Sequence, residues 1–244
     1  MSKKTALVTG ASRGIGRAIA KRLAADGFHI YIHYVSNAEK ANSLLQEIEA
    51  EGGSAQLVQA DLQELTQTEV LAATAANVDV LVLNASVQIR RPWQQIPMEE
   101  AITQLTCNYL SSLRLMQAAT AHMQAQNWGR IVTIGSVQQA KPHPDMLVYS
   151  ASKSALENTV RSLALQLASY GVTVNNVAPG VIATDRNVQA LSDEAYAAQV
   201  RASIPSGYYG TPEDCAGIVS ILCSEEGRYI TGQDIFVDGG KSIQ

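Results

Sequence analysis

Cysteine is scarce in this chain of 244 residues, and the three that occur lie far apart. Cys107, Cys215 and Cys223 are too few and too scattered to build a disulfide framework or a zinc site. The sequence therefore predicts a protein without a metal site that is kept in a reducing compartment, the cytoplasm.

Basic runs, targeting signals and membrane spans are missing as well. Lys and Arg number 18 against 22 Asp and Glu, the net charge is −4, and no basic run is longer than an adjacent pair. This balance argues against a protein that binds nucleic acid or an anionic membrane surface. The N-terminal stretch MSKKTALVTG has only a five-residue strand-like run after its lysines, which is too short for a signal peptide, and no segment is long and apolar enough to cross a bilayer.

The order of apolar segments indicates an α/β fold. With 46% hydrophobic and 16% charged residues, residues 1–244 suit one compact domain. Seven short runs rich in β-branched residues each end in a turn residue and precede a segment of helical period. Such alternation predicts a Rossmann-type, doubly wound sheet of about seven parallel strands with helices on both faces. The runs are TALVT, HIYIHY, AQLVQA, DVLVLN, RIVTIGS, VTVNNVA and DIFVDGG.

Ligands of such a sheet bind outside the carboxyl ends of the strands. The residues that follow the runs should therefore line one rim of the molecule. They are residues 10–16, 33–37, 61–62, 84–86, Ser136 and 179–184.

The stretch TGASRGIG, residues 9–16, follows the first run and opens into a helix. Gly10 can adopt a backbone conformation closed to other residues, Gly14 lets a diphosphate approach the main chain, and Gly16 allows helix and strand to pack closely. The helix N-terminus then offers free N–H groups to phosphate oxygens. An ordinary strand-to-helix turn is the alternative, but the position in the first βα unit favours a dinucleotide site.

The second run indicates which dinucleotide is bound. A carboxylate about twenty residues past the glycines would hold the adenosine ribose 2′-hydroxyl, whereas HYVSN, residues 33–37, has no acid before Glu39. Arg13 can pair with a 2′-phosphate, and Ser36 and Asn37 can donate hydrogen bonds to it. We therefore predict NADP(H) as cofactor, with a solvated loop position as the alternative for Arg13.

The stretch YSASK places Tyr149 and Lys153 one helical turn apart. A phenol has an ordinary pKa near ~10, and a neighbouring ammonium group lowers it by favouring the phenolate. Such a phenol can act as general acid when a carbonyl becomes an alcohol, and as general base in reverse. Ser136, after the fifth run, can stabilise charge that develops on the carbonyl oxygen. Taken alone, the pair is also typical of a solvated helix face.

Together these motifs resemble the short-chain dehydrogenase/reductase family across essentially the whole chain. The resemblance is carried by TGASRGIG, by Asn84 after the fourth run, by Ser136 thirteen residues before Tyr149, and by Lys153 and Pro179-Gly180. It implies that Lys153 also holds the nicotinamide ribose. It further implies that Asn108, on the long helix before the fifth run, anchors a water molecule leading to Lys153.

The resemblance divides the chain into a cofactor-binding part, about residues 1–135, and a catalytic and substrate part, about residues 136–244. Its implied catalytic residues are Asn108, Ser136, Tyr149 and Lys153. Its implied cofactor-binding residues are Gly10, Ser12, Arg13, Gly14, Ile15, Gly16, Ser36, Asn37, Asp61, Leu62, Asn84, Ala85, Tyr149, Lys153, Pro179, Gly180, Val181 and Thr184.

Asp61 and the segment at residues 83–86 have open interpretations. Asp61 matches a position that contacts adenine, but it can equally be the N-cap of the next helix. The segment LNAS departs from the family's N-N-A-G: Leu83 lacks an amide that ties strands together, and Ser86 would be costly if the position required positive φ.

The substrate is the most open question. The nearest resemblance is to 3-oxoacyl-(acyl-carrier-protein) reductases, which implies a small-molecule or carrier-bound carbonyl substrate. Sugar-acid or polyol dehydrogenases of the same family are the alternative, and a non-catalytic NADP(H)-sensing protein is an alternative of another class. Arg90, Arg91 and His143 either contact substrate or are ordinary loop residues, and residues 185–209 suggest a mobile lid. The resemblance also implies that the chain assembles as a homotetramer, with a dimer as the alternative.

Overall fold

A computed structural model describes residues 3–185, 187 and 192–244. Five residues of the predicted lid, residue 186 and residues 188–191, lie outside this range. The described part of the lid includes one helix, α8 (Glu194–Ala202).

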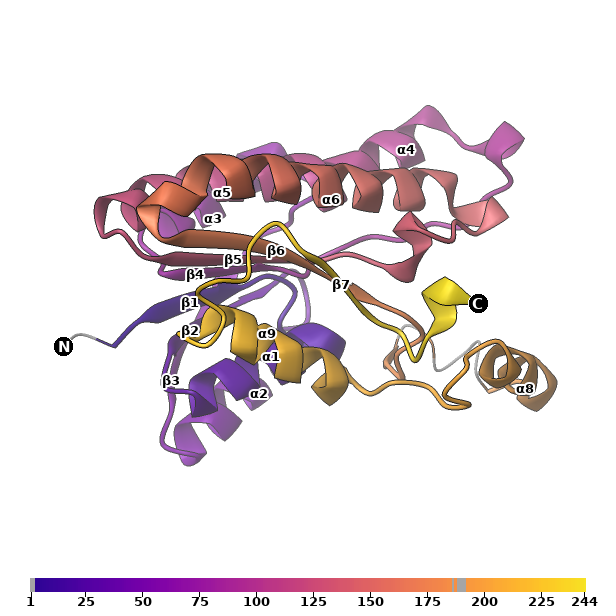
Figure 1. The fold of residues 1–244 in the computed structure, drawn as a ribbon, viewed down its shortest axis with the longest axis horizontal. Coiled ribbons are helices and arrows are strands. Elements are labelled where there is room, and N and C mark those ends of the chain that lie inside the picture. Colours follow the sequence, from indigo (N-terminus) through magenta and orange to yellow (C-terminus); the bar gives the residue numbers. More distant parts are fainter. Residues whose placement is uncertain (1–2, 186, 188–191) are drawn as a thin grey trace.

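The centre of the molecule is a seven-stranded, all-parallel sheet in the order β3-β2-β1-β4-β5-β6-β7 (Figure 1). Every position of β4, β5 and β6 is buried, because helices cover both faces of these strands. The chain reverses its direction of winding between β1 and β4, and a crevice opens at such a switch point. The predicted fold class and all seven predicted strands are confirmed. The strands are β1 (Thr5–Val8), β2 (His29–Tyr34), β3 (Ser54–Gln59), β4 (Val80–Leu83), β5 (Gly129–Ile134), β6 (Val172–Pro179) and β7 (Asp234–Val237).

Two helical layers enclose the sheet, and each packs an apolar core against it. Figure 1 shows α1, α2 and α9 on one face, and α3, α4, α5 and α6 on the other. As predicted, α1 stops before Gly27, which has φ of +101°. The helices are α1 (Gly14–Ala25), α2 (Ala38–Ala50), α3 (Leu65–Ala75), α4 (Met98–Leu105), α5 (Ser111–Ala125), α6 (Leu147–Leu167) and α9 (Pro212–Cys223).

The long helix predicted before β5 is not one regular α-helix. A π-helical turn, η2 (Thr106–Leu110), separates α4 from α5 and contains Asn108. A π-helical turn inserts an extra residue into the helical hydrogen-bonding pattern, so the residues on either side change their facing. The predicted long helix is therefore present over residues 98–125, with a π-helical turn inside it at Asn108.

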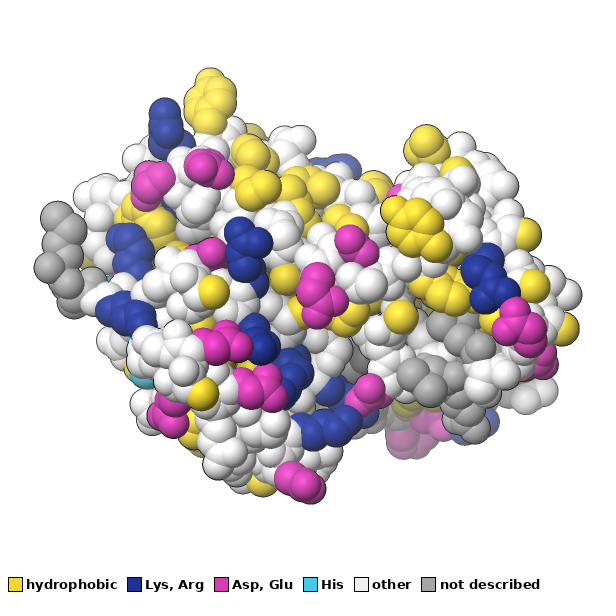
Figure 2. Space-filling view, turned by 90° about the horizontal axis from the view of Figure 1, so that it is seen from below, with side chains coloured by type: hydrophobic (Ala, Val, Ile, Leu, Met, Phe, Trp, Pro, Cys, Tyr) yellow, Lys and Arg dark blue, Asp and Glu magenta, His cyan; other side chains and the backbone are white. Residues whose placement is uncertain are grey.

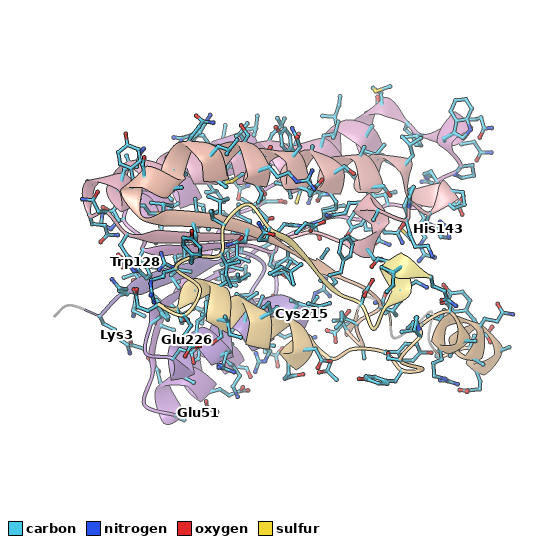
Figure 3. The ribbon with its side chains drawn as sticks, in the orientation of Figure 1. Lys3, Glu51, Trp128, His143, Cys215 and Glu226 are labelled. Atoms are coloured by element: carbon cyan, nitrogen blue, oxygen red, sulfur yellow. The ribbon has the colours of Figure 1, made fainter. Side chains whose placement is uncertain are left out.

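The outer surface of α1 and α2 carries interleaved charges. Figure 2 shows basic and acidic side chains mixed over this face, and Lys21 of α1 pairs with Glu47 and Glu51 of α2. In the described part of the chain, no helix has the length and apolar character needed to span a bilayer. In Figure 3, Trp128 lies at the amino ends of the strands and His143 lies at their carboxyl ends.

Candidate active site

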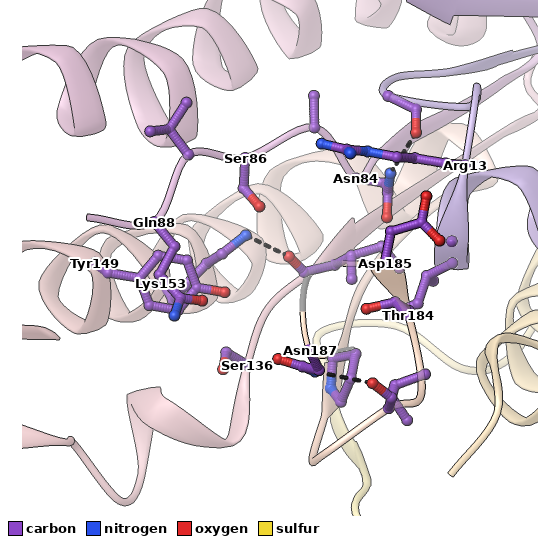
Figure 4. Close-up of a pocket in the computed structure, with 18 of the residues that line it drawn as sticks. Arg13, Asn84, Ser86, Gln88, Ser136, Tyr149, Lys153, Thr184, Asp185 and Asn187 are labelled. Atoms are coloured by element: carbon purple, nitrogen blue, oxygen red, sulfur yellow. Dashed lines mark hydrogen bonds between the residues drawn. The ribbon is translucent and has the colours of Figure 1, made fainter. Parts of the chain in front are cut away.

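A cavity of about 640 Å³ lies at the carboxyl ends of the strands. This volume is in the range of small-molecule and cofactor pockets. Of the predicted site residues, only Gly16 and Asn108 do not line it. Figure 4 shows several of the others, including Arg13, Ser136 and Tyr149, which come from both halves of the chain. The lining residues among those predicted are Gly10, Ser12, Arg13, Gly14, Ile15, Ser36, Asn37, Asp61, Leu62, Asn84, Ala85, Ser136, Tyr149, Lys153, Pro179, Gly180, Val181 and Thr184.

The glycine turn has a geometry that only glycine can satisfy. Gly10 and Gly14 have φ of +64° and +55°, in the left-handed region that disfavours side chains. A Cβ at Gly16 would lie 2.4 Å from the carbonyl oxygen of Gly10. The turn therefore keeps its main chain open toward the cavity, as a diphosphate would require.

His33, at the end of β2, fixes this turn from behind. Its Nδ1 accepts the backbone N–H of Gly10 at 2.9 Å, so Nε2 carries the proton and donates to the carbonyl oxygen of Ala60 at 2.9 Å. The side chain is 0% exposed, and burial lowers the pKa of His33 to about 4. The sequence placed His33 on the rim but did not indicate this bond, which joins β2 to the turn after β1.

Asn84 and Thr9 join the exits of β4 and β1. The Asn84 amide donates to the carbonyl oxygens of Thr9 and Gly10 at 2.9 and 3.1 Å. In return, the Thr9 hydroxyl accepts the backbone N–H groups of Asn84 and Ala85 at 2.9 and 3.0 Å. Asn84 thus positions the glycine turn as well as lining the cavity.

The departures at residues 83–86 are accommodated without strain. Among the described residues, Asn127 is the only non-glycine with positive φ, so Ser86 does not occupy a position that requires glycine. Leu83 is buried in the core, and the Thr9 hydroxyl joins the exits of β1 and β4 by accepting the Asn84 N–H.

Polar residues gather where the adenosine end of a dinucleotide is expected. Asn37 is the N-cap of α2, because its Oδ1 accepts the backbone N–H of Lys40 at 2.9 Å. Asp61 lines the cavity, but the alternative that it caps α3 is wrong. Glu64 precedes that helix, and Asp61 accepts the backbone N–H of Gln63 instead.

Tyr149 and Lys153 meet on the cavity side of α6. They are only 5% and 2% exposed, and the Lys153 Nζ lies 5.6 Å from the centroid of the Tyr149 ring. Lys153 also donates to the carbonyl oxygen of Ile134 at 2.7 Å, which holds its amine at the end of β5. A buried ammonium beside a phenol in a cavity is an arrangement suited to proton transfer.

Ser136 is held by a partly buried hydrogen-bond network that the sequence did not predict. Its Oγ accepts the backbone N–H of Gln138 at 3.2 Å, while its own N–H donates to Gln139 Oε1 at 3.2 Å. Gln139 donates in turn to Asp234 Oδ2 at 2.7 Å, and Asn176 donates to Asp234 Oδ1 at 2.6 Å. Because this network joins residues far apart in the chain, only the folded structure reveals it.

Asn108 organises the site through the main chain. Its amide accepts the Val87 N–H at 2.8 Å, donates to the Val87 carbonyl oxygen at 2.9 Å and donates to Ser152 Oγ at 3.1 Å. Ser152 donates to the Tyr149 carbonyl oxygen at 2.7 Å. Asn108 therefore links the cavity segment at Val87 to α6. Its role in holding water remains a prediction.

The residues of the substrate side separate into two groups. Arg90 and His143 line the cavity, together with Lys241 near the C-terminus. Arg91 does not line it, and forms a two-bond ion pair with Glu100 at 3.0 and 2.7 Å. Only one of the two adjacent arginines thus faces the space where a substrate would lie.

Comparison with known proteins agrees with this geometry. Residues 10–242 match the family model described as Enoyl-(Acyl carrier protein) reductase. The 3-oxoacyl-[acyl-carrier-protein] reductase FabG of Staphylococcus aureus is 36% identical over 241 residues, which cover 97% of each chain.

Two solved structures extend the comparison. A 3-oxoacyl (acyl-carrier-protein) reductase from Agrobacterium tumefaciens with NADP bound is 38% identical, with a TM-score of 0.92 and coverage of 97% of this chain and 93% of that one. A protein from Beutenbergia cavernae, suggested to be an NAD(P)-dependent gluconate 5-dehydrogenase and containing NADP at low occupancy, is 36% identical, with a TM-score of 0.94 and coverage of 100% and 98%.

Proposed function

Because this chain belongs to the short-chain dehydrogenase/reductase family, whose oxidoreductases act on CH–OH and C=O groups with a nicotinamide cofactor, we propose that it is an NADPH-dependent carbonyl reductase. The observation that carries the proposal is the pairing of Tyr149 with Lys153 in one cavity with Ser136. When bound, NADPH supplies the hydride.

The residues of the cavity fit a dinucleotide with a 2′-phosphate. The glycine turn leaves its main chain accessible, and Arg13 in that turn offers a bidentate cation. The solved Agrobacterium relative contains NADP. Arg13→Ala should weaken NADPH binding far more than NADH binding, and equal losses would contradict the phosphate assignment.

Three side chains have separate roles in reduction of the substrate carbonyl. Tyr149 donates its phenolic proton to the carbonyl oxygen as the alcohol forms. The Ser136 hydroxyl donates a hydrogen bond to the same oxygen and so stabilises the charge that develops there. The Gln138 N–H donates to Ser136 Oγ and holds the hydroxyl in place. Lys153 keeps a positive charge near the phenol, which favours proton release and recovery.

For the substrate, we propose first a 3-oxoacyl thioester on an acyl carrier. Reductases of this kind stand among both the sequence and the structural relatives. The open rim of the cavity at the carboxyl ends of the strands suits a substrate presented on a long arm.

A sugar acid is the second candidate, and a specific observation favours it. Arg90, Lys241 and His143 all line the cavity, and a carboxylate would find two cations there. The Beutenbergia relative, suggested to act on gluconate, agrees with this alternative. Arg90→Gln should then raise the KM for a keto-sugar acid, while Arg91→Gln provides a matched control outside the cavity.

The decisive experiment follows NADPH absorbance with an acetoacetyl thioester, keto-sugar acids and simple diketones, each repeated with NADH. Turnover of the thioester alone supports the acyl reductase, and turnover of keto-sugar acids alone supports the second candidate. Tight NADPH binding with no turnover of any compound would favour a non-catalytic NADP(H)-sensing protein.

We also propose a cytoplasmic homotetramer, with a dimer as the alternative. The helices α4 and α6 expose large apolar side chains, including Met98, Ile102 and Leu165, which a second copy of the chain could cover. The three cysteines are buried and form no disulfide bond, as a reducing compartment would favour. Light scattering of the purified protein tests the assembly, and a monomer would contradict it.

A further inference from the structure

An acidic side chain lies in the cavity wall on the side where a phosphate is expected. Asp185 lines the cavity and accepts a hydrogen bond from the Lys40 Nζ at 2.6 Å. Lys40 belongs to the first turn of α2 and does not itself line the cavity, whereas Asp185 follows β6, so the ion pair joins α2 to the cavity wall.

A second cation acts on the same carboxylate. Figure 4 shows Asp185 beside Arg13 of the glycine turn. The hydrogen bond from Lys40, with the positive charges of Lys40 and Arg13, holds the pKa of Asp185 below its ordinary range. Ser36 and Asn37, which are also polar, line the same cavity. Two positive charges, on Lys40 and Arg13, thus act on one carboxylate of the cavity wall.

We propose that Lys40 is a specificity-determining residue for the 2′-phosphate of NADP(H), and that Asp185 is an internal competitor which the phosphate displaces. This inference rests on the proposed preference for NADP(H). It adds a second cation to Arg13 and assigns an inhibitory role to an acid that the sequence did not single out.

The ion pair is suited to exchange because it is open to solvent. The side chains of Lys40 and Asp185 are 47% and 49% exposed, and exposed ion pairs are weak because water and salt screen them. A phosphate monoester carries close to two negative charges at neutral pH and three acceptor oxygens, so it competes well with one carboxylate. The uncharged 2′-hydroxyl of NADH cannot displace Asp185, and the ion pair would then persist.

The two partners therefore have opposite expected effects on NADPH binding. Lys40→Gln should raise the Kd for NADPH about tenfold and leave the Kd for NADH within about twofold. Asp185→Asn keeps the shape of the side chain but removes the competing charge, so the Kd for NADPH should fall about threefold. Isothermal titration calorimetry of the full chain with each dinucleotide measures both values.

Lys21→Gln is the matched control. Lys21 also forms ion pairs on the surface, but its partners Glu47 and Glu51 do not line the cavity, whereas the Lys40 partner Asp185 does, so both Kd values should stay unchanged. Ionic strength gives a second readout. The difference in NADPH Kd between wild type and Lys40→Gln should shrink as the salt concentration rises, because salt screens the charge of Lys40.

Each other outcome overturns the inference. An equal rise in the Kd values for NADPH and NADH in Lys40→Gln would mean that the ion pair only stabilises the shape of the cavity. Weaker NADPH binding by Asp185→Asn would mean that the acid assists the cofactor rather than competing with it, and unchanged Kd values would mean that neither residue takes part. A wild-type protein without NADPH preference would instead refute the proposed cofactor, whereas a clear preference that survives Lys40→Gln refutes this inference alone.

Discussion

His33 accepts the backbone N–H of Gly10 through Nδ1 at 2.9 Å, so a buried imidazole holds the first glycine of the glycine turn in place. Protonation of Nδ1 would replace this acceptor with a donor and set it against the N–H of Gly10. The turn therefore depends on the neutral form of His33.

This dependence predicts a loss of stability in mild acid. The pKa of His33 is lowered from 6.5 to about 4 in the folded chain, so the unfolded chain binds an extra proton between these values. The contribution of His33 is complete above pH 6.5 and disappears as the pH falls toward 4, with a total of about 3 kcal/mol in the free energy of unfolding. Urea unfolding of wild type and His33→Asn across this range measures it. Parallel pH profiles for the two proteins would contradict the assignment.

Tyr149→Phe should abolish most turnover while leaving the cofactor in place. The substitution removes the phenolic proton but keeps the ring, which is buried on α6. General acid catalysis is worth roughly 100-fold or more, so kcat should fall by at least that factor. Fluorescence titration should give an NADPH Kd within about twofold of wild type. Surviving turnover on the compound identified by the substrate panel would show that another group supplies the proton.

Asn108→Ala separates a structural role from a role in proton transfer. The amide is 0% exposed and satisfies both backbone groups of Val87, so its removal leaves buried polar groups unpaired. We expect a loss of about 2–3 kcal/mol in the free energy of unfolding, together with lower turnover. Urea unfolding provides the measurement. A drop in kcat without any loss of stability would instead favour the predicted water relay.

The sequence predicts the fold and the rim of the site because both depend on local signals. β-branched runs and their turn residues mark the strands, and the parallel order alone brings Ser136 and the glycine turn to one edge. The positive φ of Gly10 and the facing of Tyr149 and Lys153 likewise follow from short-range geometry.

The supporting contacts could not be predicted from the same signals. The bond between His33 and Gly10 and the ion pair between Lys40 and Asp185 join residues whose separation is fixed only by packing. The residue types in the π-helical turn at Asn108 are equally common in α-helices, so they do not mark the turn. The hydrogen bonds between the Asn108 side chain and the Val87 backbone are tertiary contacts. Periodicity and propensity carry no information about such pairs.

The amide of Gln139 is the last element whose role can be tested, because it links the Ser136 N–H to Asp234. Gln139→Glu keeps the shape of the side chain but replaces the donor with a carboxylate, which would face the carboxylate of Asp234. Two carboxylates at this distance repel each other unless they share a proton, and this repulsion raises the pKa of the pair. The loss of kcat should therefore depend on pH. A carboxylate can still accept the Ser136 N–H, but repulsion from Asp234 should push it out of place. We therefore expect kcat to fall about tenfold at neutral pH and NADPH binding to persist.

The ratio of variant to wild-type kcat should recover as the pH is lowered, since a shared proton restores the donor toward Asp234. Gln126→Glu is the matched control, because Gln126 donates to Asp79 Oδ1 at 2.7 Å at the opposite end of the sheet. That variant places the same two charges together, and it should lose stability without a change in kcat of the folded protein. A fall in kcat of similar size in both variants would show that the effect is general destabilisation, and a ratio independent of pH would show that Asp234 does not act on Ser136 through Gln139.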